Sequence, residues 1–193
     1  MKSLPQVVIL GFPNVGKSTL FNRLVRKKKA LVHSLPGMTR DAVSAICSLA
    51  GKRFVLTDTG GLADSSEIPL AAAIQEKAWA AAQKADLLLL VIDGKRDLLP
   101  GEEDLLHSLR RLGRPILIIL NKVDSAEQEG RIGDFYNRLK SEDIFPISAE
   151  HKRDLDLLEE RIGRALAGGP TEKEALPPLK VAIIGRINVG KSS

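Results

Sequence analysis

The sequence predicts an α/β fold with a mostly parallel six-stranded sheet flanked by helices on both faces. Two observations carry this prediction. Short aliphatic runs alternate along the chain with stretches of helical periodicity, as they do where crossover helices join parallel strands. A glycine-rich G-x-x-x-x-G-K-S motif also stands directly between the first aliphatic run and a helical stretch, which is the setting of a phosphate-binding loop.

Six runs have the composition of strands. They are Val7–Leu10, Val43–Leu49, Phe54–Thr57, Leu87–Ile92, Ile116–Leu120 and Ile144–Ile147. The second run has the least regular pattern and could be an antiparallel edge strand.

Helical stretches lie between these runs. Apolar residues repeat at helical spacing at Leu20, Phe21 and Leu24, at Leu105, Leu109 and Leu112, and at Leu155, Leu158, Ile162 and Leu166. The alanine-rich stretch from Leu70 to Ala85 has a high helix propensity, with Trp79 as its one bulky anchor.

The chain of 193 residues is 44% hydrophobic and 27% charged, which is the balance of a globular protein and not of a disordered tail. Its net charge of +5 is concentrated in residues 1–40, which carry eight basic residues and no acid, so the remainder sums to −3. The longest apolar run, Leu87–Ile92, is far shorter than the roughly 20 residues of a membrane span. With no secretory signal and a single cysteine, Cys47, the sequence predicts a cytoplasmic protein without a disulfide or a membrane partner.

Residues 168–179 predict a linker, because they lack periodicity and have glycines and prolines at their ends. Beyond the linker, VAIIGRINVGKSS at 181–193 echoes VVILGFPNVGKST at 7–19. An offset of 174 residues indicates a duplicated domain. We therefore expect a first domain at 1–167 and, at 180–193, the strand and phosphate loop that begin a second one.

The glycine-rich motif predicts the first functional site. It consists of Gly11, Phe12, Pro13, Asn14, Val15, Gly16, Lys17 and Ser18, with Thr19 directly behind it. Small residues let backbone N–H groups surround phosphate oxygens, and the following helix adds its dipole. We expect Lys17 to reach the β- and γ-phosphates and Ser18 to ligate Mg²⁺. The alternative is a glycine-rich turn with an unrelated lysine.

A second motif ends the third run, where Asp58 is followed by Thr59, Gly60 and Gly61. A carboxylate at the end of a strand can hold Mg²⁺ through water, and the Gly61 N–H can meet a γ-phosphate. Asp93 also ends an apolar run ahead of a glycine and is an equally good candidate when taken alone. The D-x-x-G spacing favours Asp58, and a strand-end turn is the alternative for either aspartate.

Asn121-Lys122-Val123-Asp124 follows the fifth run and predicts base recognition. The Asp124 carboxylate can accept hydrogen bonds from N1–H and the 2-amino group of guanine, whereas adenine has an acceptor at N1 and no 2-amino group. The Lys122 stem can cover the base, and the Asn121 amide can brace the loop. The pair Ser148-Ala149 after the next run could donate a backbone N–H to guanine O6. An ordinary polar loop is the alternative.

Two features of the N-terminal region are weaker signals. Thr39 lies in a long loop and could complete the Mg²⁺ shell only when a γ-phosphate is present, as a switch does. Arg23, Arg26 and Lys27–Lys29 form a basic cluster at the end of the first helical stretch. This cluster favours either pairing with the helix C-terminus or contact with RNA phosphates.

In this order the segments GFPNVGKS, PGMTRD, DTGG, NKVD and SAE resemble the translation-factor-like GTPases, and the repeated NVGKS resembles the Der (EngA) family of double GTPases. The resemblance covers about residues 5–166 and 180–193. It implies a P-loop NTPase G domain that binds GTP and GDP, with the rRNA and proteins of the large ribosomal subunit as partners during its assembly. It also implies a second G domain and a KH-like domain that are missing from these 193 residues.

The resemblance also bears on hydrolysis. Leu62 stands where Ras-like enzymes have a glutamine that orients the attacking water, and leucine cannot form a hydrogen bond. Proteins similar to this one use a P-loop asparagine, here Asn14, to bind a potassium ion that can replace an arginine finger. Asn14 could instead only tolerate a tight turn. Lys152 and Asp154 occupy positions that are usually glycine, so the loop after Ala149 departs from the family pattern.

The leading hypothesis is Mg²⁺-dependent hydrolysis of GTP to GDP and phosphate. Its catalytic residues are Lys17, Thr39, Gly61 and Asn14, and its metal ligands are Ser18, Thr39, Asp58 and Asn14. One rival is a module that binds guanine nucleotide with little turnover and docks on RNA or a protein, which Leu62 makes credible. The other rival is a P-loop ATPase or kinase, which the segment 121–124 disfavours.

Overall fold

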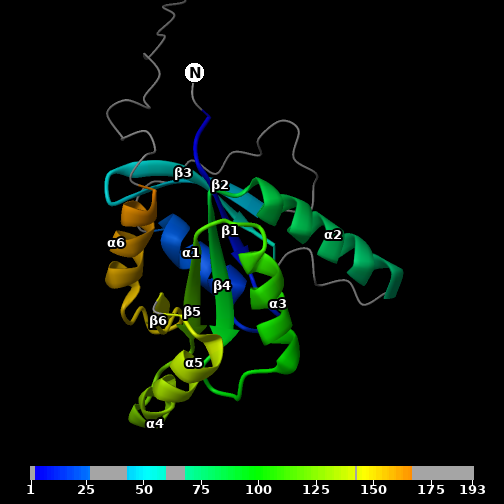
Figure 1. Cartoon of the computed structure of the whole chain (residues 1–193). Coiled ribbons are helices and arrows are strands. Elements are labelled where there is room, and N and C mark those ends of the chain that lie inside the picture. The colour runs from blue at the N-terminus through cyan, green and yellow to red at the C-terminus, as the bar shows by residue number, and fades with distance from the viewer. Residues whose placement is uncertain (1–2, 27–42, 60–67, 142, 167–193) are drawn as a thin grey trace, which may run out of the picture.

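A six-stranded sheet with the strand order β2-β3-β1-β4-β5-β6 forms the centre of the computed structural model (Figure 1), which describes residues 3–26, 43–59, 68–141 and 143–166. Its strands are Gln6–Leu10 (β1), Val43–Leu49 (β2), Lys52–Asp58 (β3), Leu87–Asp93 (β4), Ile116–Asn121 (β5) and Ile144–Pro146 (β6). Neighbouring strands are parallel except for β2 and β3, which are antiparallel. The predicted fold class and the antiparallel edge strand are confirmed.

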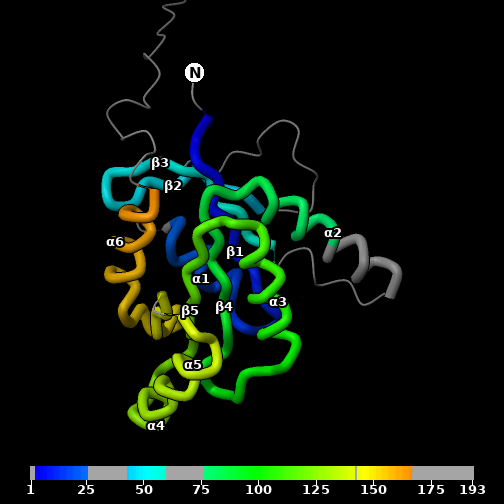
Figure 2. The backbone as a smooth tube through the Cα atoms, viewed as in Figure 1, coloured from blue at the N-terminus to red at the C-terminus, as the bar shows by residue number. Residues whose placement is uncertain are grey.

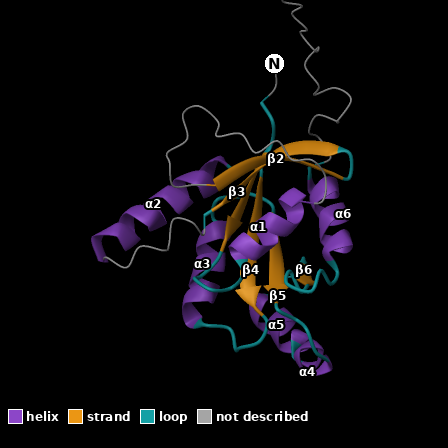
Figure 3. Ribbon diagram, turned by 180° about the vertical axis from the view of Figure 1, so that it is seen from behind, coloured by secondary structure: helices purple, strands orange, loops and turns teal. Residues whose placement is uncertain are grey.

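Helices cover both faces of this sheet. They are Lys17–Arg26 (α1), Ile68–Lys84 (α2), Pro100–Arg110 (α3), Ala126–Gly130 (α4), Ile132–Leu139 (α5) and Leu155–Ala165 (α6). The core contacts place α1 and α6 on one face and α2, α3 and α5 on the other (Figures 1 and 3). In the part of the chain that is described, no helix has the length and apolar character needed to cross a membrane.

Helices α4 and α5 were not among the predicted elements. The apolar spacing of Ile132, Phe135 and Leu139 is the signal that could have identified α5, and Phe135 and Leu139 are buried against the sheet. For α4 the signal is the S-x-x-Q capping box formed by Ser125 and Gln128.

The two faces of the sheet bury separate apolar cores, because successive side chains of a strand point to opposite sides. Val7 and Ile9 of β1 pack under α1 and α6, whereas Val8 and Leu10 pack under α2 and α3. Strand β4 is buried on both sides from Leu87 to Ile92, as expected of a central strand. Burial raises the pKa of the β2 thiol Cys47 to about 12, so this thiol stays protonated at neutral pH.

Strands β1, β3, β4 and β5 share one direction, and their carboxyl ends therefore meet at one edge of the sheet. In Figure 1 the arrowheads of β4 and β5 point toward α4 and α5, and the tube of Figure 2 shows these two helices at the end opposite the N-terminus. In an open α/β sheet this edge is where ligands bind.

The packing of α6 on the β2–β3 hairpin gives a stability prediction. A methyl group on the buried Gly163 of α6 would lie 2.5 Å from the Cβ of Ala50 in the hairpin turn, whereas a methyl group on Gly133 of α5 would meet nothing within 4 Å. Gly163→Ala should therefore lower the free energy of unfolding by about 1–3 kcal/mol, although alanine favours a helix.

The matched control is Gly133→Ala, which should leave the free energy of unfolding unchanged or raise it by up to about 1 kcal/mol. Urea unfolding of the two variants checks both values. Equal stabilisation of both proteins would contradict the close contact between α6 and the hairpin.

Candidate nucleotide-binding site

The loop between β1 and α1 approaches its neighbours too closely for side chains at two positions. Gly11 has a φ of +145° and Gly16 a φ of +96°. A Cβ on Gly11 would overlap the Val91 carbonyl oxygen, and one on Gly16 would overlap the side-chain nitrogen of Asn121. Both glycines of the predicted phosphate loop are thus required by its packing as well as by its backbone conformation.

The other residues of this loop divide between the core and the surface. Lys17 is buried, and its Nζ donates a hydrogen bond to the Phe12 carbonyl oxygen at 2.7 Å. Val15 is buried in the core beneath α1. Pro13, Asn14, Ser18 and Thr19 are exposed, so the two hydroxyls of the first turn of α1 face outward beside the loop.

The side-chain amide of Asn121 joins three loops. Its Nδ2 donates to the Val15 carbonyl oxygen at 2.8 Å, and its Oδ1 accepts from the Ala149 N–H at 3.0 Å. The side chain is 2% exposed, so both hydrogen bonds form away from water. One planar group therefore ties the phosphate loop, the loop after β5 and the loop after β6 together.

Lys122 makes a second connection to the phosphate loop. Its Nζ donates to the Asn14 carbonyl oxygen and pairs with Asp93 Oδ2, both at 2.6 Å. Asn14 and Lys122 have φ values of +63° and +69°, in the left-handed region that non-glycine residues rarely occupy. Strained backbone of this kind persists where surrounding contacts hold it and is common at functional sites.

Asp58 and Asp93, the two candidate aspartates of the sequence, have different partners in the structure. Asp93 at the end of β4 is engaged by the Lys95 N–H, which donates to Oδ1 at 2.9 Å, and by Lys122 of the loop after β5. Asp58 ends β3, is 3% exposed and pairs in register with Ile9, directly ahead of the phosphate loop. The Thr59 hydroxyl donates a hydrogen bond to the Ile9 carbonyl oxygen of β1 at 2.7 Å.

Asp124, the predicted base reader, is held from two sides. Its backbone N–H and that of Ser125 both donate to Gln128 Oε1, at 2.6 and 2.9 Å. Its carboxylate oxygen Oδ2 lies 2.7 Å from Lys95 Nζ. The hydrogen bond with Lys95 lowers the pKa of the Asp124 carboxyl, and the neighbouring Ser148 hydroxyl lowers it further. Val123, beside it, is buried in the core.

The N–H groups expected to read guanine O6 are used within the protein. Ser148 N–H donates to the Arg153 carbonyl oxygen at 3.2 Å, and Ala149 N–H donates to Asn121. Both N–H groups therefore have partners within the protein, and their contact with guanine O6 stays a prediction. Any hydrogen bond from these two groups to a base would have to be shared.

This loop is also anchored from α1. Arg23 donates from Nε to the Ala149 carbonyl oxygen at 2.8 Å and from Nη2 to the Glu150 carbonyl oxygen at 2.7 Å. Arg23 is thus a loop anchor rather than a member of a solvated basic cluster. Lys152 and Asp154, which stand in place of family glycines, have φ values of +60° and +57°, so both keep left-handed backbone despite the substitution.

Two residues in these contacts, Lys95 and Gln128, were not singled out from the sequence, and the pairing of Asp93 with Lys122 was not predicted although both residues were candidates. These contacts form only when loops after neighbouring strands are brought together. Thr39, Gly60, Gly61, Leu62, the basic residues 27–29 and the segment 168–193 lie outside the described residues. Among the described residues no three or more histidine, cysteine, aspartate or glutamate side chains form a metal-binding group.

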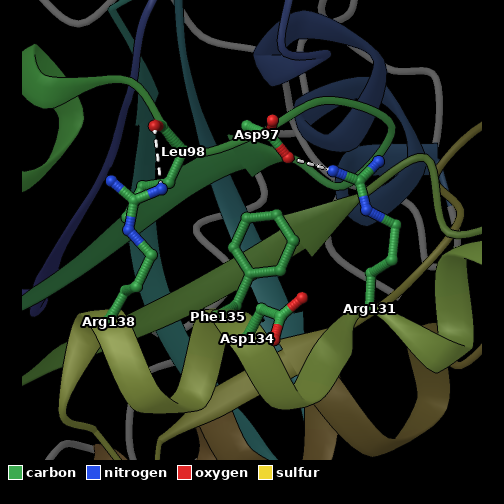
Figure 4. Close-up of a pocket in the computed structure, with 6 residues that line it drawn as sticks. All are labelled: Asp97, Leu98, Arg131, Asp134, Phe135 and Arg138. Carbon is green, nitrogen blue, oxygen red and sulfur yellow. Dashed lines mark hydrogen bonds and ion pairs between the residues drawn. The ribbon is translucent and has the colours of Figure 1, made fainter.

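A small hollow lies between the loop after β4 and α5 (Figure 4). Its volume is about 30 Å³, so a nucleotide cannot enter it. Arg131 pairs with Asp97 on one side, and Arg138 donates to the Leu98 carbonyl oxygen on the other at 3.2 Å, with Phe135 between them. The hollow is therefore a packing feature that fixes the loop after β4 against α5.

A family model described as "50S ribosome-binding GTPase" matches residues 6–122, from β1 to the lysine of the loop after β5. The chain belongs to this family. The matched region includes the phosphate loop, Asp58, and the two residues Asn121 and Lys122 that bond to the phosphate loop. The fold class predicted from the sequence is thereby confirmed as that of a P-loop GTPase.

Individual relatives agree with the family. The chain is 41% identical to the GTPase Der of Geotalea uraniireducens over 189 residues, 98% of this chain, and 41% identical to that of Aquifex aeolicus over 188 residues, 97% of this chain. It spans 43% of the length of each of these two curated relatives. The resemblance to the Der family that the sequence motifs indicated is confirmed.

Two solved structures of Era are similar in fold. A variant of Aquifex aeolicus Era bound to GDP and AlF4⁻ is 26% identical, with a TM-score of 0.70 over 95% of this chain and 63% of that one. Era bound to MgGDPNP and nucleotides 1506–1542 of 16S ribosomal RNA is 26% identical, with a TM-score of 0.69 over 92% and 60% of the two chains.

The two hydrogen bonds of the Asn121 amide give a prediction about stability that can be tested without nucleotide. Asn121→Ala leaves the Val15 carbonyl oxygen and the Ala149 N–H without their buried partner, so we expect the free energy of unfolding to fall by about 2–4 kcal/mol. Asn137→Ala, at an exposed position of α5, is the matched control and should change it by less than about 0.5 kcal/mol. Equal stabilities of the two variants in urea unfolding would show that the amide does not tie the loops together.

Proposed function

We propose that this chain is a GTP-binding domain that hydrolyses GTP to GDP and phosphate. The observation that carries the proposal is that the phosphate loop, Asp58 and the Asn121–Asp124 loop lie at one edge of the sheet, where the Asn121 amide joins the phosphate loop to the loops after β5 and β6. Membership of the 50S ribosome-binding GTPase family supports it. We further propose that the whole protein acts with the rRNA and proteins of the large ribosomal subunit as that subunit is assembled.

The phosphates would lie over the loop 11–16 and the N-terminus of α1. Backbone N–H groups there and the helix dipole favour the negative charge, and Lys17 is already folded over the loop by its bond to Phe12. The Ser18 hydroxyl and the Asp58 carboxylate supply the oxygen donors that Mg²⁺ prefers, so these residues fit that ion. Mg²⁺, when bound, would neutralise charge on the β- and γ-phosphates.

Hydrolysis requires a water oxygen to form a bond with the γ-phosphorus while the bond to the β–γ bridging oxygen breaks. Lys17 and the P-loop N–H groups would stabilise the charge that develops on the phosphate oxygens. On the basis of the sequence motifs, the proposed site also includes Thr39 and the N–H groups of Gly60 and Gly61. Leu62 offers no hydrogen bond to the attacking water, so another group has to position the water or neutralise the charge of the transition state.

We propose that a potassium ion bound at Asn14 neutralises charge in the transition state. Asn14 is exposed in the phosphate loop, and its left-handed backbone is held by the bond between its carbonyl oxygen and Lys122. A side-chain carbonyl at this place is a suitable ligand for a monovalent cation beside the phosphates. The tight turn alone would also accommodate asparagine, so turnover has to decide.

We expect GTP turnover by this chain to be at least about tenfold faster in KCl than in NaCl at matched ionic strength, because a cation at Asn14 would offset transition-state charge. Phosphate release measures the rate, and Lys17→Ala, which loses the lysine contact to the phosphates, is the control for activity from this site. Equal rates in both salts would remove the potassium site and leave a GTPase. GTP binding without turnover in either salt would favour the rival that Leu62 suggests, a guanine-nucleotide-binding module.

The base-reading role of Asp124 gives the second test. Asp124→Asn replaces an acceptor by an amide that can donate to a 2-oxo group, so we expect GDP affinity to fall by roughly ten- to a hundredfold and XDP affinity to rise. Calorimetric titration with GDP, XDP and ADP measures the preference. Asp104→Asn at an exposed position of α3 is the control. An unchanged preference for GDP would remove Asp124 from the site, and ADP binding by the unaltered chain would favour the ATPase alternative.

A further inference from the structure

The loop between β4 and α3 is fixed along its backbone. Gly94 N–H donates to the Asn121 carbonyl oxygen at 2.7 Å, so the loop begins against the end of β5. Arg131, between α4 and α5, donates to the Lys95 carbonyl oxygen at 3.3 Å and pairs with Asp97, as Figure 4 shows for the pair. These contacts leave the Lys95 side chain as the part of this residue that can move.

The far end of the loop is held equally firmly. Arg96 forms a two-pronged ion pair with Glu102, with distances of 2.9 and 2.7 Å, and this carboxylate is 1% exposed. Glu102 also accepts the Leu99 N–H at 3.0 Å at the start of α3. This pair resists separation, because Glu102 without Arg96 would be a buried charge without compensation.

The Lys95 ammonium reaches from this fixed loop to the carboxylate of Asp124. The distance from Nζ to Oδ2 is 2.7 Å, and the lysine side chain is 48% exposed against 19% for the aspartate. The other oxygen, Oδ1, is closed off from solvent and has no hydrogen-bond partner among the described residues. One oxygen of the carboxylate is therefore paired and the other is covered.

Guanine would need both of these oxygens. Its N1–H and its 2-amino group are two donors side by side, and a carboxylate meets them with one oxygen each. The backbone of Asp124 is held by Gln128, so the carboxylate has little freedom to turn toward the base while Lys95 stays in place. The lysine is the more exposed and more flexible partner, with four rotatable bonds in its stem.

We propose that Lys95 is a latch on the base-reading carboxylate: its ammonium occupies Asp124 before a nucleotide binds and must give way when guanine docks. This inference rests on the proposed role of Asp124. Lys95 is a specificity-determining residue that acts through Asp124, since only a ligand that competes for the carboxylate displaces it. The neighbouring Lys122 has a different role, because it is held by both Asp93 and the Asn14 carbonyl oxygen.

The test removes the ammonium and keeps the length of the side chain. In Lys95→Met the competitor is gone, so the Kd for GDP, measured by calorimetric titration, should fall about two- to fivefold, as expected for an ion pair with a half-exposed lysine. Lys95→Arg keeps the ion pair and should retain the wild-type Kd. Lys84→Met, an exposed lysine at the end of α2, controls for the loss of one positive charge and should also leave it unchanged.

Repeating the Lys95→Met change in the Asp124→Asn variant shows whether Lys95 affects nucleotide affinity through the Asp124 carboxylate. Asp124→Asn has a neutral amide that forms no ion pair, so adding Lys95→Met to it should leave the Kd for XDP within twofold. GDP and XDP carry the same phosphates, so a direct attraction between Lys95 and phosphate, which Lys95→Met would remove, would weaken both affinities alike. Equal changes in the affinities for GDP and XDP therefore overturn the latch, as does a GDP affinity that is unchanged or weaker in Lys95→Met.

The same data separate this inference from the function on which it rests. If Asp124→Asn still prefers GDP and does not bind XDP, the base-reading role fails and the latch fails with it. If Asp124→Asn prefers XDP while Lys95→Met gains no GDP affinity, the base-reading role stands and the latch alone is wrong.

Discussion

The side-chain amide of Asn121 is the contact on which the candidate site depends. It donates to the phosphate loop and accepts from the loop after β6 while it lies at the end of β5, so three loops share one rigid group. Gly16 has to be a glycine partly because this amide packs against it. A planar amide serves here because it offers a donor and an acceptor in one group, and the site is buried enough that each must be satisfied.

Two ion pairs extend this arrangement toward the surface. They run crosswise between neighbouring loops: Asp93 of β4 pairs with Lys122 beyond β5, and Lys95 beyond β4 pairs with Asp124. The strand register makes the crossing possible, because Asp93 and Asn121 lie side by side at the ends of their strands. The first pair has a further acceptor in the Asn14 carbonyl oxygen, whereas the second joins a half-exposed lysine to a carboxylate with a covered oxygen.

Because Lys122 has two acceptors among the described residues and Lys95 has one, the two ion pairs have different roles. A lysine with two acceptors on two loops is costly to remove and serves as a brace. A lysine on a fixed backbone with one carboxylate partner can leave at small cost, because its ammonium can return to water. The same chemistry therefore supplies a structural connection in one place and an exchangeable contact in the other. Left-handed backbone at Asn14, Lys122, Lys152 and Asp154 lies in the loops at the same edge.

Local patterns in the sequence were enough to predict the α/β class, all six strands and the antiparallel edge, because side-chain periodicity and the glycine-rich motif are properties of neighbouring residues. Helices α4 and α5 were missed although a capping box and an apolar spacing of 132, 135 and 139 were present, since both are short signals in a polar stretch.

The sequence by itself determined which residues could bind phosphate and base, and it placed them in the order that the family shares. Only the tertiary structure decided that Asp93 pairs with Lys122, that the N–H groups of Ser148 and Ala149 have partners within the protein, and that Lys95 pairs with Asp124. The physical reason is that most of these contacts join segments that follow different strands. The Ala149 N–H and the Asn121 side chain, for example, are 28 positions apart in the chain, and the sheet register brings them within hydrogen-bond distance.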